Sequence, residues 1–498
     1  MRMLKFRSRS VRMIVQQWLA IVLFVPVFGG CDRDAERSSE QDDSSEQPVD
    51  VLVVVLDTVR ADKLSAYGYP RPSSPQVDAV AAAGVVFEDV TAPSSWTWPS
   101  HASLFTGLGP WEHGAHASAK QSAVGEVGDH WGLQALRTDV PTLAEKFAGA
   151  GYRTVSLAAN HFLDPKLGLT RGFEVAETHR DLALSKRVVE LIDEPDERPL
   201  FLFVNIMIAH HPWEVYPAPW SMAHKGTLSD RERAPEWARK FLLKEAPGLD
   251  FYQIPEGDSS GGFRQLMKGE LTIPESDMHM VDDLYTGGIT AADYLLNRML
   301  TAWTKTRPNG VVAVTSDHGE YLGEHGLWDH GKTVFSQVVQ VPLVVAAPGR
   351  LPASTRIQTP VSMHDLHDTV LDLANVQTDT PRSLMAVVSG ESTPRPIQAK
   401  AWASPRWSAS MGGRFEHDWS LYREGDMALV FSSGGDRLLF DVSKDPAMTT
   451  DRSDALPGVL AELWSRAETA FPEQQTESSS PNMSAELVNE LQMLGYLD

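Results

Sequence analysis

The chain has 498 residues, and with 42% hydrophobic and 22% charged residues its composition excludes a largely disordered protein. Its formal net charge is −22 at pH 7, and basic residues cluster only within the first twelve positions. This balance argues against a nucleic-acid partner, but it leaves room for a small anionic substrate in a locally positive pocket.

The first 30 residues have the pattern of a signal peptide. A basic start is followed by the apolar run Met13–Phe28 and then by Gly-Gly-Cys31, which resembles the lipobox of bacterial lipoproteins. The resemblance implies cleavage before Cys31 and lipidation of its thiol. The alternative is an uncleaved membrane anchor, but the run of about 16 residues is short of the roughly 20 that a spanning helix needs. Either reading places the rest of the chain outside the cytoplasm, attached to a membrane of the bacterial cell envelope.

Residues 31–48 are rich in Ser, Glu, Asp and Gln and have almost nothing to bury, so they are expected to form a flexible tether. Cys31 is the only cysteine, and the folded part therefore has no intrachain disulfide.

Between residues 49 and 377, apolar β-branched runs alternate with helical patterns. The expected strands are Asp50–Leu56, Thr154–Ala159, Leu200–Ile208, Val311–Thr315 and Val341–Ala347, and the clearest helices are Pro141–Gly151 and Asp282–Lys305. This alternation predicts an α/β catalytic domain with a doubly wound, mostly parallel sheet. Ligand sites in such sheets gather at the carboxyl ends of the strands.

Two regions depart from this rhythm. Residues 213–280 are rich in Pro, Gly and Trp and are expected to be an insertion, either a substrate lid or a surface excursion with its own small core. The aromatic side chains that could stack on a sugar or a base, or form that core, are Trp220, Trp237, Phe251 and Tyr252. Residues 378–498 are expected to form a small C-terminal α+β subdomain and tail, with antiparallel strands in Trp419–Phe431 and Arg437–Asp441 and a helix over Leu456–Phe471.

Chemically active residues follow two of the predicted strands. Asp57 comes directly after the first strand, and Asp317 and His318 come directly after a later one. A carboxylate at the end of a buried strand is poorly solvated and needs a counter-charge, which a divalent cation commonly supplies.

A third segment, residues 94–107, carries a recognisable motif. It reads Ser-Ser-Trp-Thr97-Trp-Pro-Ser-His101-Ala-Ser-Leu-Phe-Thr-Gly. This resembles the sulfatase family of the alkaline phosphatase superfamily, in which Cys or Ser is followed by any residue, Pro, Ser, Arg and later Leu-Thr-Gly. The resemblance extends over residues 51–349 and includes Leu439–Pro446 and Leu494–Leu497, so it covers nearly the whole mature chain. It implies an alkaline-phosphatase-like fold.

The departures from the sulfatase pattern bear on the reaction. Thr97 stands where sulfatases have the Cys or Ser that becomes formylglycine, and Thr58 replaces the second Asp of the family's paired acids. The site is therefore similar to that of the superfamily's phosphodiesterases and phosphoglycerol or phosphoethanolamine transferases, which use threonine. That resemblance implies one divalent metal ion held by Asp57, Thr97, Asp317 and His318.

This donor set favours zinc or manganese, with calcium and magnesium left open. No set for a second metal is apparent, since Thr286 and Gly288 occupy places where relatives often have acids.

A metal-bound hydroxyl is a stronger nucleophile, so Thr97 is expected to attack the phosphorus or sulfur of the ester. By resemblance, Lys332 contacts the transferred group. His210 and His211 are candidates for protonating the leaving oxygen, and His210 matches the family's His-x-Pro segment better. His101 either replaces the missing Arg as an anion donor or only caps its helix.

Two other histidines, His325 and His330, are weaker catalytic candidates. His113 and His116 are expected to be structural.

Three functions remain open at this point. The favoured one is a hydrolase or transferase of phosphate esters, and the second is a sulfate-ester hydrolase that works without formylglycine. The third is a non-catalytic lipoprotein that binds a glycan or a lipid headgroup. In each case the expected ligand is a small anionic ester or headgroup.

Overall fold

The computed structural model describes residues 48–117, 133–228, 233–241, 261–378, 382–392, 394–403 and 405–471. The predicted signal peptide, Cys31 and almost all of the predicted tether lie outside the described residues, as do Phe251, Tyr252 and Leu494–Leu497. Within the described ranges, no helix has the length and apolar character needed to span a bilayer.

The core of the fold is an eight-stranded mixed sheet with the order β11-β2-β10-β7-β1-β6-β4-β5. In chain order its strands are β1 (Val51–Leu56), β2 (Val85–Phe87), β4 (Arg153–Ala158), β5 (Val175–Thr178), β6 (Leu200–Ile206), β7 (Val311–Thr315), β10 (Leu343–Ala346) and β11 (Thr355–Ile357). β1 pairs in parallel with both β6 and β7, whereas β10 is antiparallel to its two neighbours, β7 and β2. The predicted mostly parallel α/β sheet is confirmed.

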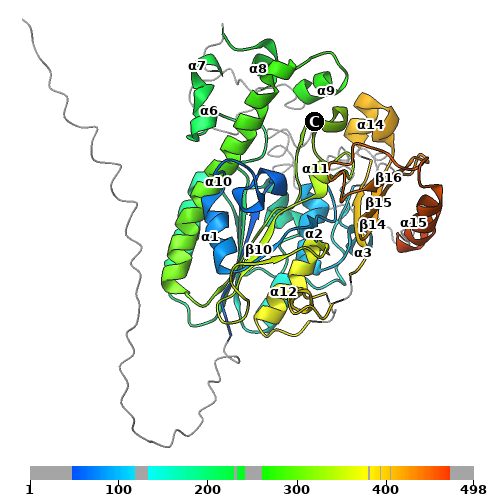
Figure 1. The fold of residues 1–498 in the computed structure, drawn as a ribbon. Helices are drawn as coiled ribbons and strands as arrows, with labels where there is room; N and C mark the ends of the chain where they lie inside the picture. Colours follow the sequence, from blue (N-terminus) through cyan, green and yellow to red (C-terminus); the bar gives the residue numbers. More distant parts are fainter. Residues whose placement is uncertain are drawn as a thin grey trace, which may run out of the picture. The chain divides into compact units, whose positions relative to one another are not determined.

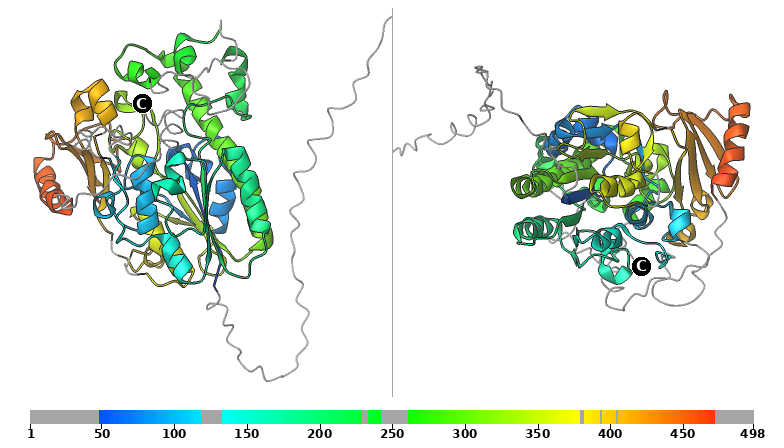
Figure 2. Two further views of the ribbon diagram at one scale, coloured as in Figure 1. Left: turned by 180° about the vertical axis from the view of Figure 1, so that it is seen from behind. Right: turned by 90° about the horizontal axis from the view of Figure 1, so that it is seen from below.

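The central strand β1 is buried on both faces because its side chains alternate between two cores. Val51, Val53 and Val55 share one core with helices α2, α4 and α12, which are Thr97–Thr106, Leu143–Gly149 and Leu366–Leu373. Its other side chains share the second core with α1, α5 and α10, which are Pro75–Ala83, Asp181–Asp193 and Met278–Thr306. Figures 1 and 2 show these helices on opposite faces of the sheet.

The insertion carries the short helices α6, α7, α8 and α9, which are Pro219–Ala223, Lys225–Leu228, Glu236–Phe241 and Gly261–Met267. They gather around the N-terminal end of α10, at the top of Figure 1. Trp237 is 2% exposed, donates a hydrogen bond to Asp277 at 2.8 Å and belongs to the second core, which the insertion shares with α10 and the main sheet. The ring of Trp220 lies under the guanidinium of Arg71, 5.5 Å from its centroid.

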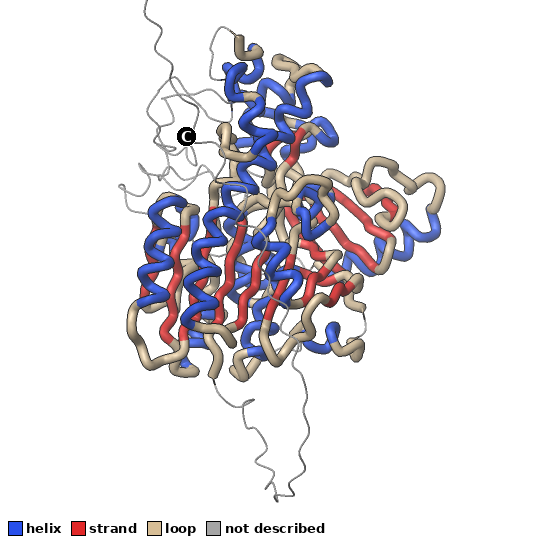
Figure 3. Tube along the Cα trace, turned by 60° about the vertical axis from the view of Figure 1, so that its left-hand side comes forward, coloured by secondary structure: helices blue, strands red, loops and turns tan. Residues whose placement is uncertain are grey.

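The C-terminal region forms a second, antiparallel sheet of β13, β14, β15 and β16, seen apart from the main sheet in Figure 3. Its strands are Ile397–Ala401, Trp419–Glu424, Met427–Ser432 and Arg437–Asp441. Helix α15 (Pro457–Ala470) packs on it through a small apolar cluster that contains Leu463 and Ala467. The predicted strand segment Trp419–Phe431 is therefore a hairpin of two strands.

Short elements complete the described chain. They are β3 (Val90–Thr91), β8 (Tyr321–Leu322), β9 (Trp328–Asp329), β12 (Val361–Ser362), α3 (Pro110–His113), α11 (Ser336–Val339), α13 (Met385–Val388) and α14 (Pro405–Met411).

Candidate active site

Thr97 is the first residue of α2, a ten-residue helix whose residues are all buried. Trp96 precedes it in an extended conformation, and Pro99 is tolerated because the first turn of a helix has no intrahelical partners for its N–H groups. Gly107 ends the helix with a φ of 70°, a conformation that glycine adopts without strain. The hydroxyl of Thr97 thus stands at a helix N-terminus, where the backbone dipoles stabilise negative charge.

Two carboxylates lie side by side because their strands are neighbours. The parallel register pairs Val55 of β1 with Thr315 of β7, so Asp57 and Asp317 follow at matching positions. Both side chains and that of His318 are at most 1% exposed, and one potential ligand atom from each lies within 4.8 Å of the others. The ends of neighbouring strands therefore bring Asp57, Asp317 and His318 together, as we expect from the sequence.

The hydroxyl of Thr97 joins this group. Its Oγ1 lies 3.4 Å from His318 Nε2 and accepts a hydrogen bond from Asn160 Nδ2 at 3.2 Å. The same amide nitrogen of Asn160 donates to Asp57 Oδ2 at 2.9 Å, and Asn205 Nδ2 donates to that oxygen at 3.0 Å. Asp57, Thr97, Asp317 and His318, the four predicted ligands, are thus brought together.

The donor set fits a divalent cation. Asp57 Oδ1 and Asp317 Oδ2 are buried and have no hydrogen-bond partner among the described residues. His318 Nδ1 lies 2.9 Å from the carbonyl of Gly319, which assigns its proton to that nitrogen and leaves the lone pair of Nε2 facing Thr97. Buried carboxylate oxygens are satisfied by hydrogen bonds or by metal, and here the hydrogen bonds are missing.

The pKa values of Asp57 and Asp317 shift in opposite directions. Burial and the neighbouring charge of Asp57 raise the pKa of Asp317 well above its usual value. Burial also acts to raise the pKa of Asp57, but the imidazole of His210, that of His318 and the amide of Asn205 outweigh it and lower that pKa. Two close carboxyls with opposite shifts favour a shared proton, and a cation at this point would allow both to ionise.

The predicted proton donors lie next to this group. His210 follows β6, and its Nδ1 donates to the carbonyl of His211 at 2.5 Å. His211 Nε2 lies 3.1 Å from Asp329 Oδ1, and the ring of His330 is 5.0 Å from that of His210 and 4.4 Å from that of His318. These rings form one continuous layer beside the carboxylates.

Lys332 is buried in the same region. Its ammonium donates to Asp329 Oδ2 at 2.7 Å and to the carbonyl of His330 at 2.8 Å, and it lies 4.1 Å from the centroid of the Trp407 ring. The preceding residue, Gly331, donates its N–H to the carbonyl of Ser95 at 2.8 Å, two residues before Thr97. The lysine-bearing loop is therefore pinned to the segment that leads into Thr97.

His101 lies in the protein interior next to Asp317. Its ring is fully buried, with Nδ1 3.0 Å from the carbonyl of Thr97 and 3.5 Å from Asp317 Oδ2. The edge-on contact with Phe203, at 5.8 Å between centroids, holds the ring in place. This geometry lets His101 support Asp317, and its roles as an anion donor or as a cap stay predictions.

Sequence reasoning gave no role to four polar residues of the site, Asn160, Asn205, Glu320 and Asp329. Asn205 lies within β6, and Asn160 follows β4 by two residues, so a rule that collects every polar side chain at the carboxyl end of a buried strand could have found them. Glu320 lies in the same turn after β7 as Asp317, so the rule could have found it too, whereas Asp329 lies in the short strand β9, outside the main sheet.

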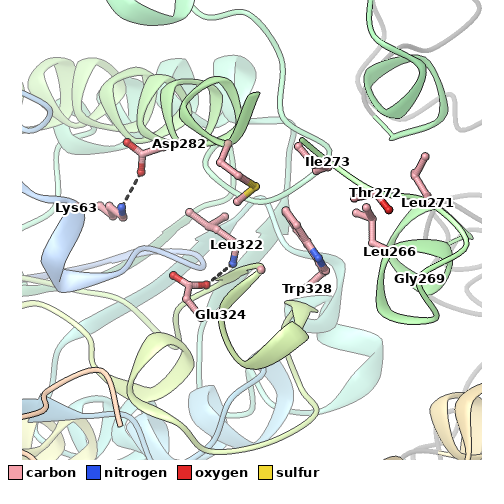
Figure 4. A pocket seen from close by; sticks show the side chains of 12 residues that line it. Lys63, Leu266, Gly269, Leu271, Thr272, Ile273, Asp282, Leu322, Glu324 and Trp328 are labelled. Atoms are coloured by element: carbon pink, nitrogen blue, oxygen red, sulfur yellow. Dashed lines mark hydrogen bonds and ion pairs between the residues drawn. The ribbon is translucent and has the colours of Figure 1, made fainter. Parts of the chain in front are cut away.

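A cavity of about 600 Å³ adjoins the hairpin of β8 and β9 (Figure 4). Its wall includes Leu266 and Ile273 of the insertion, Met278 and Asp282 of α10, and Trp328. The ring of Phe263 in α9 contacts both Trp328, at 6.5 Å between centroids, and His211, at 4.7 Å. The insertion thus touches both the cavity and the layer of histidines.

A buried hydroxyl at a helix start lies beside two carboxylates and an imidazole at the strand ends of a mostly parallel α/β sheet. The family model described as Sulfatase matches residues 50–376, which is more than half of the chain. The chain therefore belongs to the sulfatase family, and it is a hydrolase that acts on ester bonds.

Individual relatives are distant. The uncharacterized sulfatase YidJ of Escherichia coli is 24% identical over 364 residues, which cover 66% of this chain and 68% of that protein. A solved structure in complex with its substrate D-glucosamine-2-N,6-O-disulfate has a TM-score of 0.63 at 16% identity and covers 85% of this chain and 97% of that one. The phosphonate monoester hydrolase of Agrobacterium radiobacter has a TM-score of 0.60 at 18% identity, with 85% and 95% covered. These two structures establish the fold alone.

Proposed function

We propose that this enzyme hydrolyses a phosphate ester with Thr97 as its nucleophile. The observation that carries the proposal is the position of the Thr97 hydroxyl, at the start of α2 and next to two buried carboxylate oxygens without hydrogen-bond partners among the described residues. A divalent cation held by Asp57, Thr97, Asp317 and His318 would lower the pKa of the hydroxyl and neutralise the transferred group.

The chain's own residues account for the remaining steps. Thr97 releases its hydroxyl proton to solvent, and its oxygen attacks phosphorus in line. The bond to the leaving oxygen breaks, and a covalent threonyl phosphate ester forms. His210 or His211 gives a proton to the leaving oxygen, and water then cleaves the threonyl ester and releases phosphate. The N-terminal dipole of α2 and the ammonium of Lys332 stabilise the negative charge on the transferred group.

The choice of phosphorus over sulfur rests on Thr97. Oxidation of a threonine side chain cannot give the aldehyde whose hydrate sulfatases use, so this chain must attack with the hydroxyl itself. A phosphonate ester hydrolase shares the fold, which supports phosphorus chemistry on this scaffold. Family membership favours the second candidate, hydrolysis of a sulfate ester without formylglycine.

The test is turnover of aryl phosphate, bis-aryl phosphate and aryl sulfate by the full chain in detergent, with zinc, manganese, magnesium or calcium added. We expect phosphate-ester turnover that is lost in Thr97→Ala and retained in part in Thr97→Ser, which keeps a hydroxyl. Thr304→Ala changes an exposed threonine on α10 and serves as the matched control. Turnover of the sulfate ester alone would refute the phosphoryl proposal, and no turnover of any ester with any cation would favour the non-catalytic binder.

The same proposal includes a membrane anchor and the kind of molecule that carries the ester. We infer that the chain is held at the bacterial envelope by a lipid on Cys31 and acts on an ester carried by a glycan or a lipid headgroup. The basic and apolar start of the sequence supports the anchor, and the sulfated sugar bound to a structural relative supports the glycan. Release of Cys31→Ser from the membrane fraction into the soluble fraction of the producing cell tests the anchor.

A further inference from the structure

A second group of potential metal ligands lies outside the predicted cation site. It consists of His211, Glu320, Asp329 and His330, and is called the hairpin cluster below because β8 and β9 separate Glu320 from His330. One nitrogen or carboxylate oxygen from each of the four lies within 4.8 Å of the others. The residues come from the loop after β6, the turn after β7 and the end of β9, so only the fold brings them together.

The potential ligand atoms lie close to one another. His330 Nδ1 lies 3.2 Å from Glu320 Oε1 and 3.0 Å from Asp329 Oδ1. His211 Nε2 lies 3.1 Å from the same oxygen of Asp329. Glu320 is fully buried and Asp329 is 7% exposed, while the two imidazoles are each 14% exposed. A small cation could therefore reach the cluster from the histidine side.

The cluster contains two buried carboxyl groups beside one lysine. Lys332 pairs with Asp329 through Oδ2, which leaves Oδ1 turned toward the imidazoles. Glu320 Oε2 is buried and has no hydrogen-bond partner among the described residues. Lys332 pairs directly with Asp329, and a cation would supply a direct counter-charge for an ionised Glu320 in this buried position.

The backbone conformation of Asp329 is unusual. Asp329 has a φ of 65°, in the left-handed region that a non-glycine residue adopts at a cost of about 1–3 kcal/mol. That conformation directs its carboxylate back to His211 and Lys332. Strained residues of this kind persist where the surrounding structure holds them for a function.

We propose that the hairpin cluster binds a second divalent cation through His211 Nε2, a Glu320 carboxylate oxygen, Asp329 Oδ1 and His330 Nδ1. Two imidazole nitrogens and two carboxylate oxygens are a donor set that suits zinc or manganese. The centroid of the His330 ring is 4.4 Å from that of the His318 ring, so the second ion neighbours the first site. In the proposed function, on which this role rests, the second ion would help to neutralise the charge of the transferred group, and His210 rather than His211 would then protonate the leaving oxygen.

The competing occupant of the cluster is a proton. An Nδ1–H of His330 would donate to Glu320 and Asp329 and would make the cluster a proton relay rather than a metal site. The two possibilities differ in metal stoichiometry. No ligand set for a second ion was apparent in the sequence, because Thr286 and Gly288 of α10 stand where relatives often have acids.

The test measures metal content rather than turnover. The full chain in detergent is loaded with Zn²⁺, freed of excess metal by gel filtration, and its zinc per chain is determined by mass spectrometry. We expect two ions per wild-type chain, and one in each of Glu320→Gln, His330→Asn and Asp57→Asn. His325→Asn changes a histidine of the same hairpin that is not in the cluster and should retain both ions.

Circular dichroism identifies a variant that fails to fold, and the isosteric Glu320→Gln is the variant least expected to do so. The second site would be overturned if the wild-type chain holds one ion, Asp57→Asn holds none and Glu320→Gln still holds one. The proposed function would stand in that case if phosphate-ester turnover persists. Two ions in both wild type and Glu320→Gln would place the second ion elsewhere and would also overturn the assignment.

Discussion

Asn160 and Asn205 offer a matched pair of perturbations at the candidate active site. Each donates one amide hydrogen to Asp57 Oδ2, at 2.9 and 3.0 Å, but only Asn160 also donates to the Thr97 hydroxyl, at 3.2 Å. Leucine has nearly the shape of asparagine and no donor. Asn160→Leu therefore removes support from both the carboxylate and the Thr97 hydroxyl. Asn205→Leu removes one donor to the carboxylate and also the Oδ1 that accepts the backbone N–H of Asn160 at 3.1 Å, so it reaches Thr97 only indirectly.

The expected losses of metal affinity and of kcat follow from the charge of Asp57. A hydrogen bond to an ionised group contributes about 1.5–3 kcal/mol, which corresponds to a factor of roughly 10 to 150 in an equilibrium constant. Partners behind a metal ligand typically change metal affinity by about 10- to 100-fold. We therefore expect both variants to bind the catalytic cation about 10- to 100-fold more weakly, and Asn160→Leu to lose about tenfold more in kcat at saturating metal.

The assay is a titration of zinc or manganese into metal-free protein, followed by kcat measured with the cation far above its Kd. Asn160 Oδ1 also accepts the N–H of Phe162 at 3.0 Å and caps a short helical turn, so chemical unfolding of the metal-free chains reports that loss separately. Equal effects of the two variants on kcat at saturating metal would show that the contact of Asn160 with Thr97 has no catalytic role. Metal affinity within twofold of wild type in both would refute the placement of the cation at Asp57.

Three further outcomes are expected. Phe203→Ala should lower the free energy of unfolding by about 3–5 kcal/mol in a urea titration, because this fully buried ring packs with its centroid 4.8 Å from that of Phe105. A loss below about 1 kcal/mol would contradict that packing. Burial raises the pKa of Asp293 from 3.8 to about 7, so the folded state holds the proton more tightly. The contribution of Asp293 to stability should fall by about 3 kcal/mol as the pH rises from 4 to 7, and urea titrations of Asp293→Asn should lack that part of the slope. Zinc at about 1,000 times its Kd should raise the free energy of unfolding of wild type by about 4 kcal/mol, and equal stabilisation of Asp57→Asn would exclude that residue as a ligand.

Regular burial patterns made the central fold predictable from the sequence. Val51–Leu56 is apolar throughout because both faces of β1 are covered, and that run gives a strong strand signal. Strands β2 and β5, of three and four residues, were not predicted, because such short segments carry too little periodicity. The antiparallel direction of β10 was also outside what its apolar sequence could specify, since strand direction depends on how the loops on either side cross the sheet.

The candidate site was predictable to the extent that it follows strand ends. Asp57 and Asp317 each end a strand, and strand neighbourhood alone brings them together. The hairpin cluster could not be anticipated in this way. It depends on the φ of 65° at Asp329 and on a two-residue pairing of β8 with β9, and neither leaves a pattern in the sequence.

The substitution of the family's second acid by Thr58 bears on the charge that the site accepts. The Thr58 hydroxyl donates to the carbonyl of Asp57 at 2.7 Å, and its N–H lies 3.2 Å from Asp317 Oδ1, so it orients a carboxylate without adding one. A negative charge about 4 Å from a substrate anion would cost about 4 kcal/mol at an effective dielectric constant near 20. A sulfate monoester carries one negative charge, and a phosphate monoester carries close to two at neutral pH. Removal of one carboxylate therefore favours the dianion more than the monoanion, which is the same direction that the hydroxyl of Thr97 indicates.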